Sequence, residues 1–226
     1  MRYAKEVVYH FADCPIFFWG SIPCTAGCPW HNVNHSRAEK GLMPNFKALH
    51  RSHMITFRKL FSNFRELSFL VKNTAGENNI AFEWPKGITL WKRRELRNWI
   101  KTCELNEVTF NGCMVGLVSK KGDPIYKPWK VVTRSAPLLL KLSVNKAKKK
   151  QGLCSCGATQ HCQAKGSVTK ETGFYPEKMC DIIHSAISQT FRIQASDPGR
   201  HSGRGTVKDL RGPKPKKGVA APALLP

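Results

Sequence analysis

The chain of 226 residues contains few acidic side chains and no long apolar segment. No apolar run approaches the roughly 20 residues that cross a membrane as a helix. The first residues also lack the layout of a secretory signal peptide. No basic helix with a clean apolar face stands out, so we expect no membrane partner.

The charge is strongly one-sided, because 37 Lys and Arg residues stand against 15 Asp and Glu residues, for a formal net charge of +22. Basic side chains that meet phosphates release counterions, which favours association with nucleic acid. Nucleic acid is therefore the predicted partner. The alternative is a basic protein that is merely soluble or that carries basic tails.

Nine cysteines are scattered through the chain, and their number is odd. Such an arrangement favours reduced thiols over a secreted disulfide framework. We therefore expect an intracellular protein, in the nucleus or the cytoplasm.

Alternating apolar patterns predict an α/β fold with helices packed on a sheet. Short apolar runs predict strands at residues 79–84 and 107–110, one or two strands within 7–22, and strands at 115–118 and 125–133 around a turn. Apolar residues at three- and four-residue steps predict helices at 46–71, 90–103 and 176–191. Residues 24–44, rich in Gly, Asn, His and Pro, are expected to form a loop.

Composition divides the chain into three parts. We expect an α/β unit at 1–150, a Cys/His loop with a helix at 151–192, and a disordered basic tail at 193–226. Four lysines near the end of the first part join the tail as the predicted nucleic-acid contacts: Lys146, Lys148, Lys149 and Lys150.

Two apolar segments end in reactive or acidic side chains. Residues 18–24 read Phe-Trp-Gly-Ser-Ile-Pro-Cys, and residues 80–85 read Ile-Ala-Phe-Glu-Trp-Pro. They resemble the two catalytic strand ends of DNA cytosine-5 methyltransferases, although Glu-Trp-Pro stands where that family has Glu-Asn-Val. The resemblance implies that Cys24 attacks C6 of a flipped cytosine and that Glu83 binds N3 and the exocyclic amine.

Physical chemistry is consistent with both roles. A thiolate at the end of a buried strand can be activated and aimed at the base. A carboxyl group that holds the base ring favours protonation of N3 and so eases attack by the thiolate. A flipped base needs such a pocket. The alternatives are that Cys24 is a small buried apolar side chain, that Glu83 only caps or pairs at a strand end, and that the tryptophans belong to the core.

A third piece, Gly-Cys-Met-Val-Gly-Leu at residues 112–117, precedes Lys-Pro-Trp at 127–129. It is similar to the segment that closes the family's catalytic half. The family's paired arginines are absent, and Lys127 and Lys130 are the candidates for the phosphate-facing role. The ordered set of pieces, with Pro-Cys-Thr-Ala-Gly-Cys-Pro-Trp at 23–30, resembles more closely proteins of unassigned function that travel with mobile-element polyproteins.

The resemblance implies an incomplete Rossmann-like sheet of the class I methyltransferase type. Only 23 residues precede Cys24, whereas one strand-helix-strand unit takes about 30 residues. We therefore expect the half that binds S-adenosylmethionine to be missing. Three explanations of the missing half stay open. A partner chain supplies it, the chain is a fragment of a longer polyprotein, or the activity has been lost. The first strand is then an exposed edge open to pairing.

A short loop gathers ligand types that zinc prefers. Cys154, Cys156, His161 and Cys162 lie close together in sequence and predict a zinc site. Because His161 and Cys162 are adjacent, they rarely ligate together, and Cys180 and His184 are alternative ligands. The other interpretation is a reduced loop without metal.

Three functional hypotheses follow. The first is a methyltransferase-like remnant that contacts nucleic acid, enzymatic at most in part. The second is a non-enzymatic basic nucleic-acid-binding protein. The third is a zinc-stabilised interaction module.

Overall fold

The computed structural model describes residues 1–12, 14–75, 79–147, 149–150, 153–162, 164 and 172–196. It is a mixed α/β fold, as predicted. Most of the predicted basic tail lies outside the described residues, and so does Lys148. No helix in the described part of the chain has both the length and the apolar character needed to cross a membrane.

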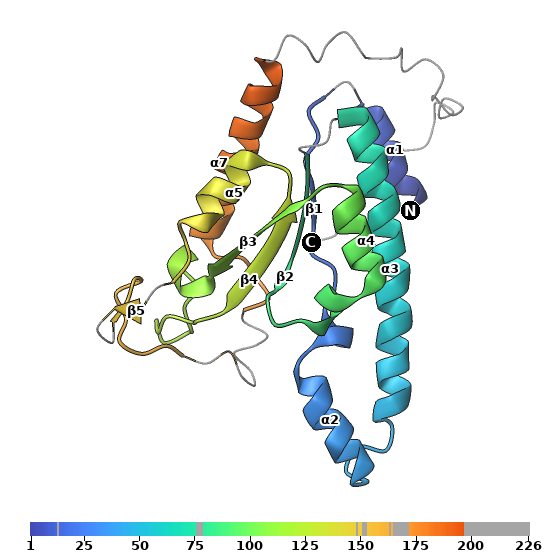
Figure 1. The fold of residues 1–226 in the computed structure, drawn as a ribbon, viewed down its shortest axis with the longest axis vertical. Helices are drawn as coiled ribbons and strands as arrows, with labels where there is room; N and C mark the ends of the chain where they lie inside the picture. The colour runs from blue at the N-terminus through green and yellow to red at the C-terminus, as the bar shows by residue number, and fades with distance from the viewer. Residues whose placement is uncertain are drawn as a thin grey trace.

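A four-stranded sheet forms the centre of the molecule (Figure 1). Its strand order is β1-β2-β4-β3, for β1 Phe18–Gly20, β2 Ile80–Pro85, β4 Pro128–Thr133 and β3 Asn106–Asn111. β1 and β2 are parallel, whereas β4 runs antiparallel to both β2 and β3. The carboxyl ends of β1 and β2 therefore lie at the same edge of the sheet, and β1 has a described neighbour on one side only.

Aromatic side chains fill the space between one face of the sheet and two helices. The helices are α3 Phe46–Ala75 and α4 Arg94–Thr102, which lie together on this side in Figure 1. The buried rings are Phe57, Phe61, Phe64, Phe82, Trp84, Trp91 and Trp99. The packing is so close that a Cβ on Gly20 would come within 2.1 Å of the Phe64 ring, which explains why β1 ends in glycine.

Smaller apolar side chains cover the opposite face. α5 Ala136–Ser143 and α7 Glu177–Ala195 pack there and against each other. Ser135 caps α5 by accepting a hydrogen bond from the Leu138 amide at 3.2 Å. α7 contributes Met179, Ile183 and Ala186 to this cluster, so the helix predicted at 176–191 belongs to the same body as the sheet.

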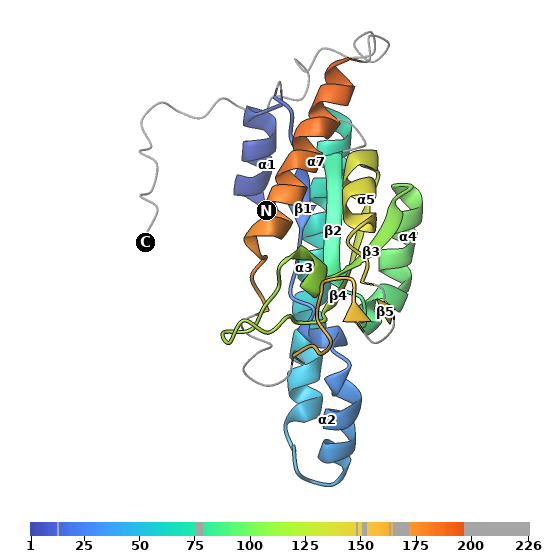
Figure 2. The same ribbon diagram turned by 90° about the vertical axis from the view of Figure 1, so that its left-hand side faces the viewer.

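Two segments differ from the sequence-based expectation. The strand predicted to begin near Val7 is instead the helix α1 Arg2–His10, which lies along α3, with Val8 buried. The predicted loop at 24–44 contains the helix α2 Trp30–Glu39, which projects with the start of α3 beyond the sheet (Figure 2). α2 has little helical apolar pattern in its sequence, so packing against α3 stabilises it. α1 does have the apolar face of an amphipathic helix, a signal that the expectation of a strand overlooked.

Short elements complete the described chain. The 3-10 helices are η1 Thr25–Gly27, η3 Thr89–Lys92 and η4 Gly112–Val115, and β5 Lys149–Lys150 pairs with β6 Leu153–Cys154. The strand expected at 115–118 is wrong. Residues there form part of η4 and a turn, and the predicted hairpin is reduced to a single bridge between Val118 and Pro124.

Candidate functional site: a strand-end cluster and a cysteine-rich centre

The structure brings Cys24 and Glu83 together. β1 ends at Gly20 and leads into the loop with Cys24, while Glu83 lies near the end of β2. Because β1 and β2 are parallel neighbours, both side chains are carried to the same edge of the sheet. The two groups are close enough for the Glu83 charge to contribute to a raised pKa of Cys24. We call Ser21, Cys24, Glu83, Lys127 and Tyr175 the strand-end cluster.

Glu83 is buried, and only one of its two carboxyl oxygens has hydrogen-bond partners among the described residues. It is 3% exposed. Its Oε2 accepts hydrogen bonds from the Ser21 hydroxyl at 3.0 Å and from the Tyr175 hydroxyl at 2.6 Å. Its Oε1 is buried and has no hydrogen-bond partner among the described residues. Such a buried acceptor is costly unless a ligand or water satisfies it.

Burial dominates the protonation of the cluster. It raises the pKa of Glu83 above 4.5, even though the hydrogen bonds from Tyr175 and Ser21 and the charge of Lys127 oppose it. Burial, followed by the charge of Glu83, raises the pKa of Cys24. Burial also lowers the pKa of Lys127, against the attraction of Glu83 and Cys24. Burial therefore shifts the titration of each of these three groups toward its neutral form.

Lys127 joins this cluster, but Lys130 does not. The Lys127 ammonium group donates to the Thr172 carbonyl at 2.7 Å and lies 4.9 Å from the centre of the Trp129 ring. Lys130 belongs to the aromatic face of the sheet, opposite Glu83, because successive side chains of β4 alternate between faces.

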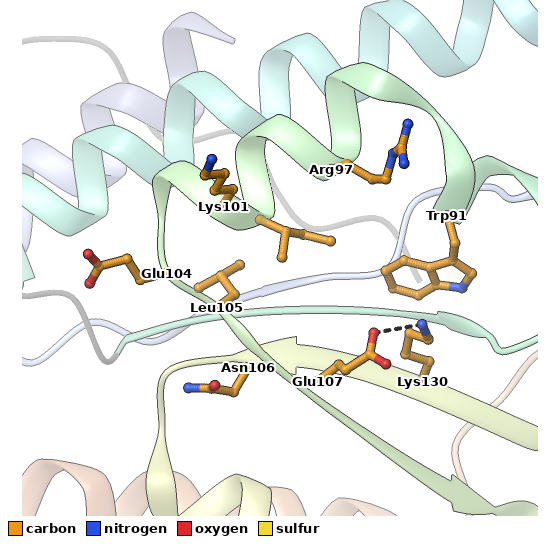
Figure 3. A pocket seen from close by; sticks show the side chains of 9 residues that line it. Trp91, Arg97, Lys101, Glu104, Leu105, Asn106, Glu107 and Lys130 are labelled. Carbon is orange, nitrogen blue, oxygen red and sulfur yellow. Dashed lines mark hydrogen bonds and ion pairs between the residues drawn. The ribbon is translucent and has the colours of Figure 1, made fainter.

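Lys130 lines a separate cavity of about 590 Å³ (Figure 3). It forms a 2.7 Å ion pair with Glu107, and its ammonium group lies 5.1 Å from the centre of the Trp91 ring. Of the other predicted contacts, Lys146 is exposed, and Lys149–Lys150 form the backbone of β5.

A second group of cysteines converges beside the sheet. The donor atoms of Cys113, Cys154, Cys156 and His161 all lie within 4.8 Å of one another. Three thiols and one imidazole are a common tetrahedral ligand set for zinc. We call this group the cysteine-rich centre. Its donor atoms already lie close enough together to hold a metal ion.

The structure corrects one member of the predicted ligand set. Cys113 from η4 stands where Cys162 was expected. The Cys162 amide donates to the Pro124 carbonyl at 2.9 Å, and its side chain packs with the apolar cluster that covers the second face of the sheet. In extended backbone, successive side chains point to opposite sides. His161 can therefore reach the centre while Cys162 points into the core.

Crowding of the thiols affects their protonation. Burial, together with the charges of Cys156 and Cys154, raises the pKa of Cys113 to about 12. Burial also opposes ionisation of Cys154, but hydrogen bonds from Cys156 and Cys113 outweigh it and lower the pKa of that thiol. One thiolate is thus favoured at the expense of the others, a conflict that a bound cation would relieve.

Sequence reasoning missed three residues of these sites. Ser21 lies within a quoted segment, but its role depends on the register between β1 and β2. Tyr175 is 92 residues from Glu83 and belongs to none of the segments used for the resemblance. Cys113 belongs to the Gly-Cys-Met-Val-Gly-Leu piece and was not among the predicted ligands. The signal that could have indicated it is a further cysteine in a chain whose Cys/His loop offers an incomplete ligand set.

Basic side chains line the outer surface of the two helices on the aromatic face. α3 exposes arginines at seven-residue steps, and α4 exposes basic residues on successive turns: Arg51, Arg58, Arg65, Arg94, Arg97 and Lys101. Arg58 lies near enough to help lower the pKa of Glu95 on α4, although burial opposes that shift and backbone and Arg93 hydrogen bonds contribute more. We call these six residues the basic surface.

Comparison with known proteins adds no assignment. No family model matches the chain, and neither the curated proteins nor the solved structures give a significant match.

Proposed function

We propose that the strand-end cluster binds an unstacked nucleobase of a nucleic acid, in the manner of the catalytic half of a cytosine-5 methyltransferase. The unpartnered Oε1 of Glu83 beside Cys24 is the observation that supports this most directly. A base edge with a ring nitrogen and an amine would satisfy that atom. A flipped base is read through such hydrogen bonds to its Watson–Crick edge.

The geometry of Glu83 favours cytosine among the bases. When Glu83 is protonated, its proton belongs on Oε1, because Oε2 accepts two hydrogen bonds. There it can be donated to N3 of cytosine. When Glu83 is ionised, Oε1 can instead accept a hydrogen bond from the exocyclic amine.

Cys24 could add to such a base when it is deprotonated. The thiolate would form a bond to C6, and the C5–C6 double bond would shift to C4–C5. The C4–N3 double bond would then give its electron pair to N3, which would take the proton from Glu83. Burial raises the pKa of Cys24 and so opposes formation of the thiolate. The rate of addition should therefore rise with pH for as long as Glu83 keeps its proton. Base binding is thus the principal role that we propose, and covalent addition is secondary.

The arrangement of the sheet supports the same interpretation. The order β1-β2-β4-β3, with antiparallel β4 between β2 and β3, resembles the corresponding half of a class I methyltransferase sheet. Nothing in the described residues supports a site for S-adenosylmethionine. We propose a methyltransferase-like remnant of mobile-element origin that binds bases, with β1 as the edge that a partner chain would extend.

The basic surface supports nucleic acid as the polymer. Its six exposed cations lie on the two helices that cover the aromatic face of the sheet. A nucleic-acid strand could therefore contact them through its phosphates. This surface also supports the alternative of a non-enzymatic nucleic-acid-binding protein. That alternative needs the basic surface but not Cys24 or Glu83.

Covalent trapping tests the proposal. A single-stranded oligonucleotide containing 5-azacytosine forms a stable adduct with a thiol that adds to C6, because N5 takes up the released electron pair and a proton. We expect an adduct on Cys24 at pH 8 to 9, detected by intact-mass analysis and peptide mapping. Cys24→Ser should abolish it, and the control variant Cys14→Ser, at an exposed cysteine, should retain it.

Two other outcomes are informative. Salt-sensitive binding without an adduct, unchanged in Cys24→Ser and Glu83→Gln, would overturn base binding and leave the non-enzymatic alternative. An adduct that persists in Cys24→Ser would assign reactivity to another thiol.

The cysteine-rich centre supports a second, structural function. We propose that it binds zinc and thereby fixes the loop at 153–162 to η4 at the end of β3. Replacement of zinc by Co²⁺ should give the intense thiolate-to-metal absorption of a Cys₃His site. A cobalt spectrum without thiolate bands would contradict this assignment.

A further inference from the structure

A group of histidines lies apart from both sites, where α2 and the start of α3 pack together. His31 and His35 are four residues apart on α2, so they share one face of that helix. His50 faces them from α3, with its ring centre 4.4 Å from that of His31. With Cys28, these three histidines help to line a cavity of about 280 Å³.

His31 is held in the tautomer that a metal ligand requires. Its Nε2 lies 2.5 Å from the Thr25 carbonyl oxygen. A carbonyl oxygen can only accept, so the hydrogen is on Nε2 and the neutral ring carries its lone pair on Nδ1. That Nδ1 is buried and has no hydrogen-bond partner among the described residues. Metal-binding histidines typically donate their second ring nitrogen to a carbonyl or carboxylate in this way.

The other two imidazoles complement His31. His35 Nδ1 lies 3.0 Å from the Glu39 carboxylate, which leaves Nε2 as the free donor atom. His50 Nδ1 is buried and, in the described chain, also lacks a hydrogen-bond partner. Arg93 lines the same cavity, but its charge is offset by Glu95 at 3.1 Å.

We propose that this pocket binds a divalent ion of the zinc class through His31, His35 and His50, with Cys28 as the fourth donor. Imidazole and thiolate select Zn²⁺ over Mg²⁺ or Ca²⁺, which prefer oxygen. The donor atoms are less convergent than in the cysteine-rich centre, so binding involves rotation of the exposed His35 ring and the half-buried His50 ring. The ion would join α2 to α3 and would fix Thr25, the residue next to Cys24.

Zinc content measured after dialysis against a zinc buffer tests this inference independently of base binding. We expect the wild-type chain to retain about two zinc ions. His50→Asn and His35→Asn should each retain about one, with affinity for the second ion reduced about tenfold or more. The control His184→Asn, which alters an exposed histidine on α7, should retain both.

The two metal sites are distinguished by their spectra. With Co²⁺, Cys113→Ser should remove most of the thiolate absorption, whereas His50→Asn should leave most of it. If His50→Asn does not fold, the exposed His35 provides the test. Zinc content and affinity unchanged in His35→Asn and His50→Asn would overturn the proposal.

Discussion

The strand-end cluster and the cysteine-rich centre place the same residue type in opposite chemical settings. Cys24 lies beside a buried carboxyl group at the end of a strand, where burial raises the pKa of the thiol. Cys113, Cys154 and Cys156 instead face one another and His161. Neighbouring groups, and not the cysteine itself, therefore determine the protonation and the possible ligands of each thiol.

The largest expected effect concerns the cysteine-rich centre. Cys113→Ser should lose bound zinc and lower the free energy of unfolding by more than about 3 kcal/mol, because metal binding contributes directly to folding. Cys162→Ser is the matched control and should keep its zinc, since Cys162 packs toward the core. Zinc content with chemical denaturation measures both. Zinc loss in Cys162→Ser but not in Cys113→Ser would reverse the correction of the ligand set.

The next effect concerns Tyr175. Its hydroxyl donates to Glu83 and accepts from the Trp19 indole at 3.2 Å. Tyr175→Phe should lower the free energy of unfolding by about 1–3 kcal/mol, because Oε2 of Glu83 loses one of its two donors and the half-buried Trp19 indole loses its acceptor. Tyr126→Phe, at an exposed tyrosine, should change it by less than about 0.5 kcal/mol. Equal effects of the two variants would show that Glu83 is not anchored by Tyr175.

Glu83→Gln should change how stability depends on pH. The folded-state pKa of Glu83 is raised above its ordinary value of 4.5, so the folded state holds its proton where the unfolded state has lost it. Wild-type stability should therefore fall as the pH rises from about 4.5 to the folded-state pKa, by about 1.4 kcal/mol per pH unit within that window.

The glutamine variant lacks this contribution, and its amide oxygen can still accept from Ser21 and Tyr175. The difference in the free energy of unfolding between Glu83→Gln and wild type should grow in favour of the variant with rising pH. Denaturation at a series of pH values measures it. A constant difference would show that Glu83 is not the buried acid described here.

The smallest expected effect separates the two lysines. Lys127→Gln should reduce formation of the 5-azacytosine adduct, because Lys127 lies beside Glu83 and Cys24. Lys130→Gln should leave adduct formation unchanged and cost about 0.2–1 kcal/mol of stability, since its partner Glu107 is 63% exposed. Equal loss of adduct in both variants would contradict their placement on opposite faces of the sheet.

Local patterns predicted the parts of the fold whose side chains repeat with a clear period. The apolar spacing at 46–71 predicted α3, and the apolar runs at 79–84 and 107–110 predicted β2 and β3. The segments with Cys24 and Glu83 were singled out by their resemblance to the catalytic strand ends of cytosine-5 methyltransferases. α2 escaped prediction because its sequence has little helical periodicity and its packing against α3 stabilises it. α1 escaped prediction although its sequence is amphipathic.

The sequence by itself determined the basic charge, the α/β character and the residues available for chemistry. Only the tertiary structure decided which of those residues meet. It placed Tyr175 on Glu83, Cys113 with the Cys/His loop, and Lys130 on the far side of the sheet from Lys127. The physical reason is that strand register and helix packing fix contacts between segments distant in the chain, whereas periodicity reports only on neighbours along it.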